Sequence, residues 1–181
     1  TERKYDQSNV AEFLSNKNNF ILFHFDEKWI YKQYLKSYID IEPNSYLDLI
    51  NFLEKIVNKT NNNLIISTGN RNNKFIENFK NDFSEINTNI YNFNKNKIFF
   101  LNNLSMKQLE FVISKCFTIV TCHGAPTHIA AAFNKKIIDI IDVSEKLFFV
   151  KWSAHFRKYE QLHRFEFNKL SEIILSKISN K

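Results

Sequence analysis

The residues best suited to chemistry in this chain are concentrated in one stretch, from Thr118 to Phe133. An apolar, β-branched run ends there in Cys122-His123-Gly124, and a segment of small residues follows Pro126. This pattern predicts a strand that turns sharply into a helix. The first turn of a helix leaves backbone N–H groups unpaired and carries the positive end of the helix dipole. The sequence therefore predicts an anion site at this turn, and phosphate is the anion most often bound in such places.

Other polar residues follow the remaining apolar runs, 20–25, 64–68 and 98–101, and both glycines of the chain lie at such ends. In an open parallel sheet, ligands bind beyond the carboxyl ends of the strands. We therefore expect one binding site, and we expect the residues at these ends to form it: His24, Lys28, Thr68, Gly69, Asn102, Cys122, His123, Gly124, Ala125, Thr127 and His128.

Each of these residues has a structural interpretation beside the functional one. His128 either caps the core or contacts a phosphate or a sugar. Lys28 is either a solvated surface lysine or a mobile point charge that pairs with a diphosphate. Gly124 permits a tight turn, and its N–H would then be free to contact a diphosphate oxygen; these two interpretations are compatible.

Two further chemistries are possible for the cysteines and histidines, and the pattern favours neither. A metal site at Cys116, Cys122, His123 and His128 lacks the paired short spacing of zinc sites. A Cys122 nucleophile with a histidine base would need a third, orienting group, and nothing in the sequence marks one. We expect no metal and no other cofactor, and we assign no catalytic residue.

The elements that must position these residues alternate along the chain. Continuous apolar runs predict strands, and apolar stripes at three- and four-residue spacing predict helices between them. The expected strands are 20–25, 64–68, 98–101, 116–121 and 136–141, and the expected helices include 47–57, 75–79, 105–113 and 170–178. Such alternation predicts a doubly wound, Rossmann-like α/β fold with a parallel sheet.

Polar residues also predict where two of these helices begin. Asn44 or Ser45 is placed to cap the helix that contains 47–57. Ser105 and Gln108 have the spacing of a capping box, in which each side chain bonds to the backbone of the other residue.

The composition limits the range of partners. At 181 residues the chain is long enough for one domain, 1–181, or for the larger half of a two-domain enzyme. A net charge of +6 suits an anionic ligand, an anionic membrane surface or a nucleic acid. Because the lysines are scattered and form no block with interleaved aromatic residues, we expect no nucleic-acid partner.

The two cysteines suggest a compartment. Cys116 and Cys122 fall on one expected strand, six positions apart, which is too far for a disulfide bond between them. Free thiols are typical of a reducing compartment, so we expect the protein in the cytoplasm. No apolar run approaches the roughly 20 residues of a membrane span.

The segment from Gly124 to Ala132 resembles a motif of glycosyltransferase family 9, the heptosyltransferases of lipopolysaccharide assembly. That family's motif reads Asp-Ser/Thr-Gly-Pro-x-His-Leu-Ala-Ala-Ala and lies in the C-terminal half of a GT-B fold. Residues 23–29 are similar to the family's first strand, where a Lys followed by a Trp closes on the donor. The resemblance covers roughly residues 20–142. The chain departs from the family at Cys122-His123, which replace the Asp before the glycine, and by one extra residue before His128.

The resemblance implies a donor-binding domain of a glycosyltransferase, with a nucleotide-diphosphate sugar as substrate and no obligatory metal. It implies a glycan or lipid-linked acceptor, as in lipopolysaccharide synthesis, and an N-terminal acceptor domain that this chain lacks. A non-catalytic nucleotide-sugar-binding module and a GT-B-type nucleotide-sugar epimerase are the alternatives. The aromatic and basic segment 146–158 is either a packed interdomain surface or a face that contacts the acceptor or the inner face of the membrane.

Overall fold

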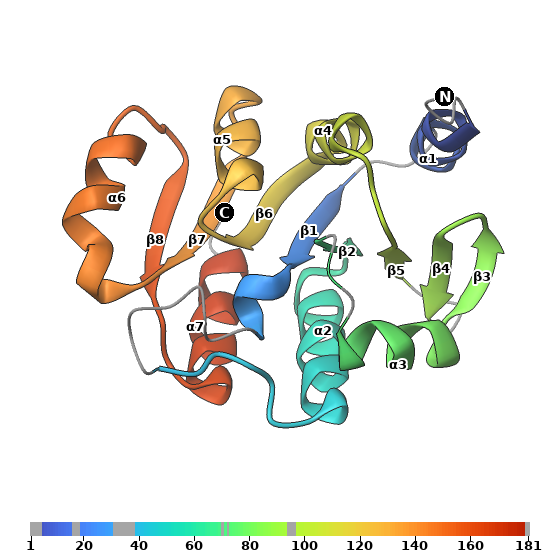
Figure 1. Ribbon diagram of the computed structural model, residues 1–181, viewed down its shortest axis with the longest axis horizontal. Helices are drawn as coiled ribbons and strands as arrows, with labels where there is room; N and C mark the ends of the chain where they lie inside the picture. The colour runs from blue at the N-terminus through green and yellow to red at the C-terminus, as the bar shows by residue number, and fades with distance from the viewer. Residues whose placement is uncertain are drawn as a thin grey trace.

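A single mixed sheet with helices on both faces organises the chain (Figure 1). The computed structural model describes residues 5–15, 19–30, 39–69, 71, 73–93 and 97–179. The eight strands lie in the order β3-β4-β5-β2-β1-β6-β7-β8. They are β1 (Phe20–Phe25), β2 (Asn63–Thr68), β3 (Ser84–Asn87), β4 (Ile90–Phe93), β5 (Ile98–Leu101), β6 (Cys116–Cys122), β7 (Lys136–Ile141) and β8 (Tyr159–His163).

All pairings from β5 to β8 are parallel, whereas β3 and β4 form an antiparallel hairpin at the edge next to β5. This confirms the predicted α/β fold with a wound parallel sheet, and every strand expected from the sequence is present. The sequence did not predict β3, β4 or β8. The side chains of β3 are all exposed, so this strand has no apolar pattern to mark it.

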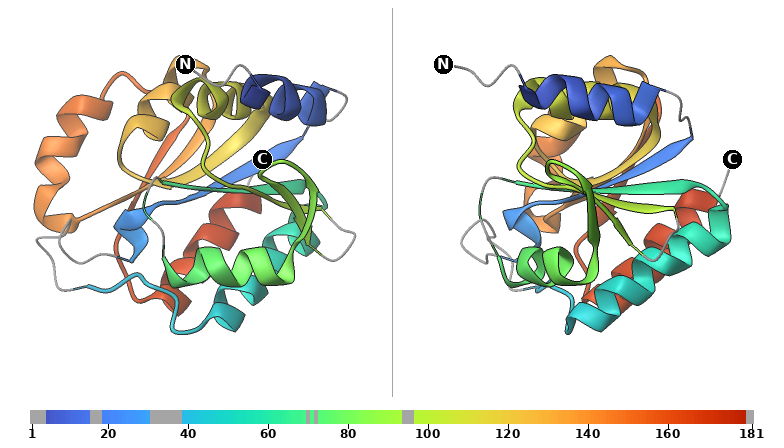
Figure 2. Two further views of the ribbon diagram at one scale, coloured as in Figure 1. Left: turned by 45° about the vertical axis from the view of Figure 1, so that its right-hand side comes forward. Right: turned by 90° about the vertical axis from the view of Figure 1, so that its right-hand side faces the viewer.

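Helices cover the sheet in two layers (Figure 2). On one face lie α2 (Tyr46–Thr60), α3 (Lys74–Asp82) and α7 (Phe167–Ser179), and on the other α1 (Tyr5–Ser15), α4 (Met106–Lys115) and α5 (Ala125–Ala132). The short helix α6 (Lys146–Ser153) follows β7 at the outer edge of the sheet. Two 3-10 turns, η1 (Glu27–Trp29) and η3 (Val143–Glu145), follow β1 and β7 directly. Each face has its own buried apolar cluster.

The helix starts follow the predicted capping. Ser45 caps α2 by accepting a hydrogen bond from the Asp48 N–H at 3.1 Å. Before α4, both bonds of the capping box form: the Ser105 N–H donates to the Gln108 side chain at 2.7 Å, and the Gln108 N–H donates to Ser105 Oγ at 3.3 Å. Two otherwise unpaired N–H groups are thereby satisfied.

The two cysteines are free and buried, and they belong to the clusters on opposite faces of the sheet. Phe20 pairs with Cys116 whereas Ile21 pairs with Thr118, so β6 has a bulge at Phe117. A bulge shifts the alternation of side chains by one residue. This shift places Cys122 in the cluster beside Trp29, below the carboxyl end of β1.

Candidate functional site

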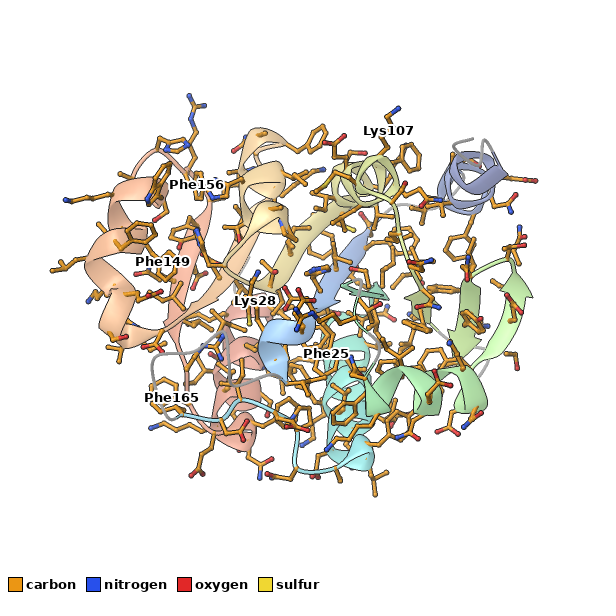
Figure 3. The ribbon with its side chains drawn as sticks, in the orientation of Figure 1. Phe25, Lys28, Lys107, Phe149, Phe156 and Phe165 are labelled. Carbon is orange, nitrogen blue, oxygen red and sulfur yellow. The ribbon has the colours of Figure 1, made fainter. Side chains whose placement is uncertain are left out.

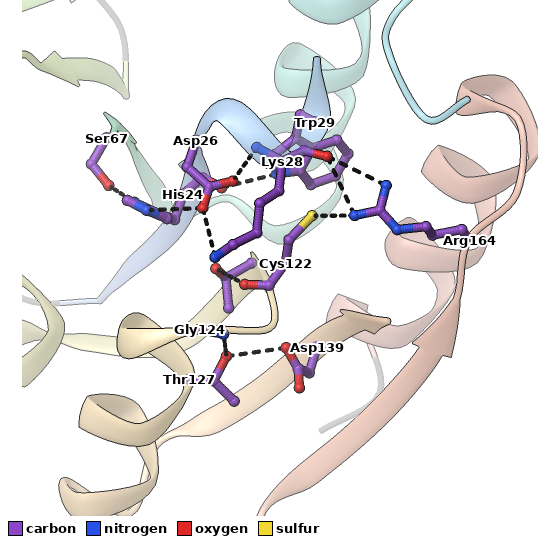
Figure 4. Close-up of polar contacts among 11 residues, drawn as sticks. His24, Asp26, Lys28, Trp29, Ser67, Cys122, Gly124, Thr127, Asp139 and Arg164 are labelled. Carbon is purple, nitrogen blue, oxygen red and sulfur yellow. Dashed lines mark hydrogen bonds and ion pairs between the residues drawn. The ribbon is translucent and has the colours of Figure 1, made fainter. Parts of the chain in front are cut away.

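The carboxyl ends of β1, β6 and β8 bring three features together: the side chain of Lys28, the turn between β6 and α5, and the guanidinium of Arg164 (Figure 4). Figure 4 shows Lys28, Cys122 and Arg164 on one side of this turn and Thr127 and Asp139 on the other. We refer to these as the arginine side and the histidine side, because His123 binds Asp139.

Lys28 occupies the position expected from the sequence. Its Nζ lies 3.2 Å from Asp26 Oδ2, and its backbone N–H donates to Asp26 Oδ1 at 3.1 Å. A Cβ added to Gly124 would lie 2.5 Å from Lys28 Nζ. The ammonium group therefore fills the space that the missing side chain of Gly124 leaves, directly beside the start of α5.

Gly124 is needed for this space and not for its backbone conformation. Its φ of 169° and ψ of −160° describe extended backbone that any residue can adopt, so the expectation of a glycine-dependent tight turn was wrong. Its N–H is also paired, since it donates to Thr127 Oγ1 at 3.2 Å.

Most backbone N–H groups at the start of α5 already form hydrogen bonds within the protein. The N–H groups of Thr127 and His128 both donate to the Gly124 carbonyl, and Pro126 has no N–H. Within the described part of the chain, the N–H of the exposed Ala125 makes no hydrogen bond. The helix therefore offers one free donor and its dipole to an anion, fewer donors than a typical first turn leaves unpaired.

Arg164, which the sequence analysis missed, completes the arginine side. It follows β8 and is only 5% exposed. Its two terminal nitrogens donate to the Lys28 carbonyl, each at 3.3 Å, and one lies 3.9 Å from Cys122 Sγ. Its Nε is buried without a partner, and no carboxylate among the described residues forms an ion pair with it. A buried cation without a counterion is costly, and an anion at this site would offset that cost.

His24 lies beneath this group at the end of β1. It is 5% exposed, its Nδ1 is 2.9 Å from Ser67 Oγ, and its Nε2 is 3.8 Å from Asp26 Oδ2. Burial lowers the pKa of His24, and the neighbouring Asp26 opposes this shift. Trp29 Nε1 donates to the His24 carbonyl at 3.0 Å and closes the turn η1 over it.

Cys122 is a buried thiol and not an activated one. Burial raises its pKa, and the charge of Asp26 raises it further, whereas Arg164 and Lys28 oppose the shift. Reactive cysteines have lowered pKa values and partial exposure. The Cys122 nucleophile that the sequence left open is therefore not favoured.

The buried carboxylate of Asp139 organises the histidine side. Asp139 lies on β7, is fully buried, and interacts with His123 Nδ1 at 2.6 Å. The hydroxyl groups of Thr127 and Tyr159 donate to it at 3.1 and 2.7 Å. Burial, followed by the charge of Asp139, raises the pKa of Tyr159, so this phenol stays a donor. The one signal in the sequence was an aspartate inside the isoleucine-rich strand Lys136–Ile141.

His128 points into a different pocket from the rest of the expected site. Its ring centroid lies 5.3 Å from that of His123 and 5.4 Å from that of Phe156. A pocket of about 470 Å³ is lined by residues of α5 and the segment after α6: His128, Ala131, Ala132, Asn134, His155, Phe156 and Arg157. No other residue of the expected site lines this pocket. Partial burial lowers the pKa of His128, and the nearby His123 adds to this effect.

The remaining expected residues follow β2 and β5. Thr68 is buried, and its hydroxyl has no hydrogen-bond partner. A Cβ at Gly69 would collide with the carboxylate of Glu27, so the end of β2 packs closely against η1. The Asn102 N–H donates to the Asn89 carbonyl at 3.1 Å, on the side of β2 away from β1.

None of the described helices is long and apolar enough to cross a membrane. Nor does the described part of the chain hold a group of three His, Cys, Asp or Glu side chains arranged to bind a metal ion. The expectation of a metal-free site stays a prediction.

Comparisons with known proteins identify the fold. No protein-family model and no curated protein sequence matches the chain. Among solved structures, the UDP-GlcNAc 2-epimerase from Methanocaldococcus jannaschii is similar with a TM-score of 0.60 and 14% identity, over 96% of this chain and 43% of that one. Staphylococcus aureus MnaA, in its co-structure with UDP, is similar with a TM-score of 0.56 and 15% identity, over 99% of this chain and 43% of that one. The Escherichia coli ADP-heptose lipopolysaccharide heptosyltransferase II is similar with a TM-score of 0.51 and 12% identity, over 98% of this chain and 52% of that one.

At these identities the likeness concerns the fold. The chain has the α/β, Rossmann-like fold of GT-B-type enzymes, and it spans about half the length or less of these structures. Membership of glycosyltransferase family 9 in particular stays a prediction.

Proposed function

We propose that this chain binds a nucleotide-diphosphate sugar and acts as the donor-binding part of a glycosyl-transferring enzyme with the GT-B fold. The observation that carries the proposal is the buried, uncompensated Arg164 beside Lys28 and the start of α5. In a wound parallel sheet this edge is where ligands bind. Several structures of the same fold belong to nucleotide-sugar enzymes, among them a complex with UDP-GlcNAc and UDP, which supports a diphosphate as the ligand.

The arrangement suits a diphosphate for electrostatic reasons. Lys28 is 28% exposed in its side chain and is held by a single carboxylate, so it can turn from Asp26 toward a ligand. Arg164 is fixed by the Lys28 carbonyl and acts mainly through its charge. The dipole of α5 adds a partial positive charge at the same point. Fixed positive groups of this kind stabilise the negative charge that develops on a leaving diphosphate when the anomeric carbon is displaced.

In this proposal the acceptor site and the catalytic base belong to the portion of such enzymes that this chain does not span. The acceptor is a glycan or a lipid-linked glycan. We prefer a glycosyltransferase to a GT-B-type epimerase, which would need acidic catalytic residues. Among the described residues of the arginine side, the one such group is Asp26, and its carboxylate is paired with Lys28.

The proposal is tested by titrating the full chain with UDP, ADP and GDP and measuring binding by calorimetry. We expect at least one diphosphate to bind below millimolar concentration and the matching nucleoside, which lacks phosphate, not to bind. Lys28→Met should weaken binding roughly tenfold, because one charged contact is lost. The control is Lys107→Met, which removes an exposed lysine from α4. Absence of binding for all three diphosphates at millimolar concentration would disprove the proposal.

A further inference from the structure

The helix α6 exposes an apolar surface that no described residue of the chain covers. We define the α6 patch as Leu147, Phe148, Val150 and Trp152, which are 82, 58, 45 and 55% exposed. Phe148 and Trp152 lie one turn apart with ring centroids separated by 6.1 Å. Elsewhere in the described chain, large exposed apolar side chains stand singly on separate elements. A contiguous exposed patch of this kind marks an interaction surface.

Among the residues that the structure describes, α6 packs against the protein through its opposite side. Phe149, labelled in Figure 3, comes from this side. Its ring centroid lies 4.4 Å from that of His123, and Ser153 is buried. The helix has no side-chain cap at its start, and Lys146 places a cation in the first turn, where it opposes the helix dipole. The turn η3, which leads directly into α6, is capped by Asp142, but little packing stabilises α6 itself. A partner on the exposed side would add that packing.

The charges around the patch indicate what that partner is. Lys146, Lys151, Arg157 and Lys158 are all exposed, and none forms an ion pair among the described residues. The acidic side chains of the same segment, Asp142 and Glu145, are buried or half-buried. Apolar side chains surrounded by cations match the boundary between acyl chains and anionic headgroups. A second copy of the same patch would bring like charges together, which disfavours self-association.

We propose that the α6 patch docks on the surface of a membrane that contains anionic lipids. Leu147, Phe148 and Trp152 enter the headgroup region, and the surrounding cations pair with lipid headgroups. Docking does not depend on a bound nucleotide. If the proposed function holds as well, the contact between Phe149 and His123 places the histidine side of the β6–α5 turn at the lipid surface, where a lipid-linked acceptor would lie.

The fluorescence of Trp152 reports docking directly. The chain has two tryptophans, and the other, Trp29, is 1% exposed. We expect vesicles of phosphatidylcholine with about 30% phosphatidylserine to shift the emission to shorter wavelength and to protect it from acrylamide. Vesicles of phosphatidylcholine alone should bind far less, and added salt should weaken the binding to anionic vesicles.

Matched variants distinguish binding through the α6 patch from non-specific hydrophobic binding and from an effect of net charge. Leu147→Ser should reduce vesicle binding roughly tenfold, whereas Leu47→Ser, at a leucine that is 65% exposed on α2, should not. The double variant Lys146→Gln/Lys151→Gln should lower binding roughly 25-fold, at about fivefold per charge. The control is Lys55→Gln/Lys59→Gln on α2, where both lysines are exposed.

Three outcomes would overturn the proposal: no binding to anionic vesicles, equal binding to both kinds of vesicle, or a Trp152 shift that appears without vesicles as protein concentration rises. The last outcome would assign the patch to a second copy of the chain. Diphosphate titration of each variant should give unchanged affinities, so failure of docking and failure of the proposed nucleotide site are observed separately.

Discussion

The two sides of the β6–α5 turn differ in how their buried charges are compensated. On the arginine side, a permanent cation is buried without a counterion, and Lys28 lies above it. On the histidine side, a buried carboxylate holds His123 and Thr127, and His128 lies in an open pocket. On the first side Asp26 pairs with Lys28, and the charge of Arg164 is left for a ligand to compensate, whereas the carboxylate of the second side is already bonded to protein groups. Diphosphate binding should therefore depend on the arginine side, and the histidine side should mainly hold the turn in place.

Removal of the Asp139 carboxylate should have the largest effect of the substitutions considered. Asp139→Ala leaves the hydroxyls of Thr127 and Tyr159 and the His123 ring without their buried partner. We expect the free energy of unfolding to fall by about 3–4 kcal/mol, measured by urea denaturation. The control Glu172→Ala, at an exposed carboxylate on α7, should change it by less than about 0.5 kcal/mol. A small effect of Asp139→Ala would mean that the histidine side does not hold the turn.

Replacement of Arg164 tests the opposite side. At an effective dielectric constant of about 20, a buried charge several ångströms from a phosphate contributes on the order of 2 kcal/mol. Arg164→Met should therefore weaken UDP binding roughly 30-fold. Arg157→Met, which removes an exposed arginine from the His128 pocket, should leave binding nearly unchanged.

The same Arg164 variant should leave the melting temperature equal or higher. Methionine fills a similar volume without burying an unpaired charge. Loss of binding together with loss of stability would instead show that Arg164 is a structural residue, and the contrast between the two sides would fail.

The histidines of the two sides should differ in their contribution to pH dependence. Burial lowers the pKa of His24 from 6.5, so the unfolded chain binds a proton near this pH that the folded chain does not. The free energy of unfolding should therefore fall below about pH 6.5, by up to about 1.4 kcal/mol per pH unit from this group.

Denaturation of the His24→Gln variant between pH 7 and 5 should show a free energy of unfolding that falls less steeply with decreasing pH than in the wild type. Glutamine keeps a polar side chain beside Ser67. His128→Gln should change the slope less, because His128 is exposed although its pKa is also lowered. Equal slopes for the wild type and His24→Gln would contradict a neutral, buried His24.

The sequence predicted the sheet well because its central strands are continuous apolar runs. It also located the turn and Lys28, since both directly follow such runs. It missed Arg164 because β8 reads Tyr-Glu-Gln-Leu-His and has no apolar run to mark a strand end. It placed His128 and Lys28 in one site, although linear spacing cannot show which side of a turn a side chain takes. The pairing between Asp139 and His123 joins β7 to the turn after β6, so neither residue alone could reveal it.

Gly124 stands between the two sides and gives the smallest predicted effect. Alanine there meets no backbone strain, because the backbone is extended, so stability should change by less than about 0.5 kcal/mol. Its Cβ would, however, occupy the space of Lys28 Nζ and push the ammonium away from the start of α5. UDP binding should weaken roughly fivefold, about 1 kcal/mol, as measured by calorimetry. In a Lys28→Met background the alanine should have no further effect on binding. A separate loss in that background would mean that Gly124 contacts the ligand itself and does not act through the space it leaves for Lys28.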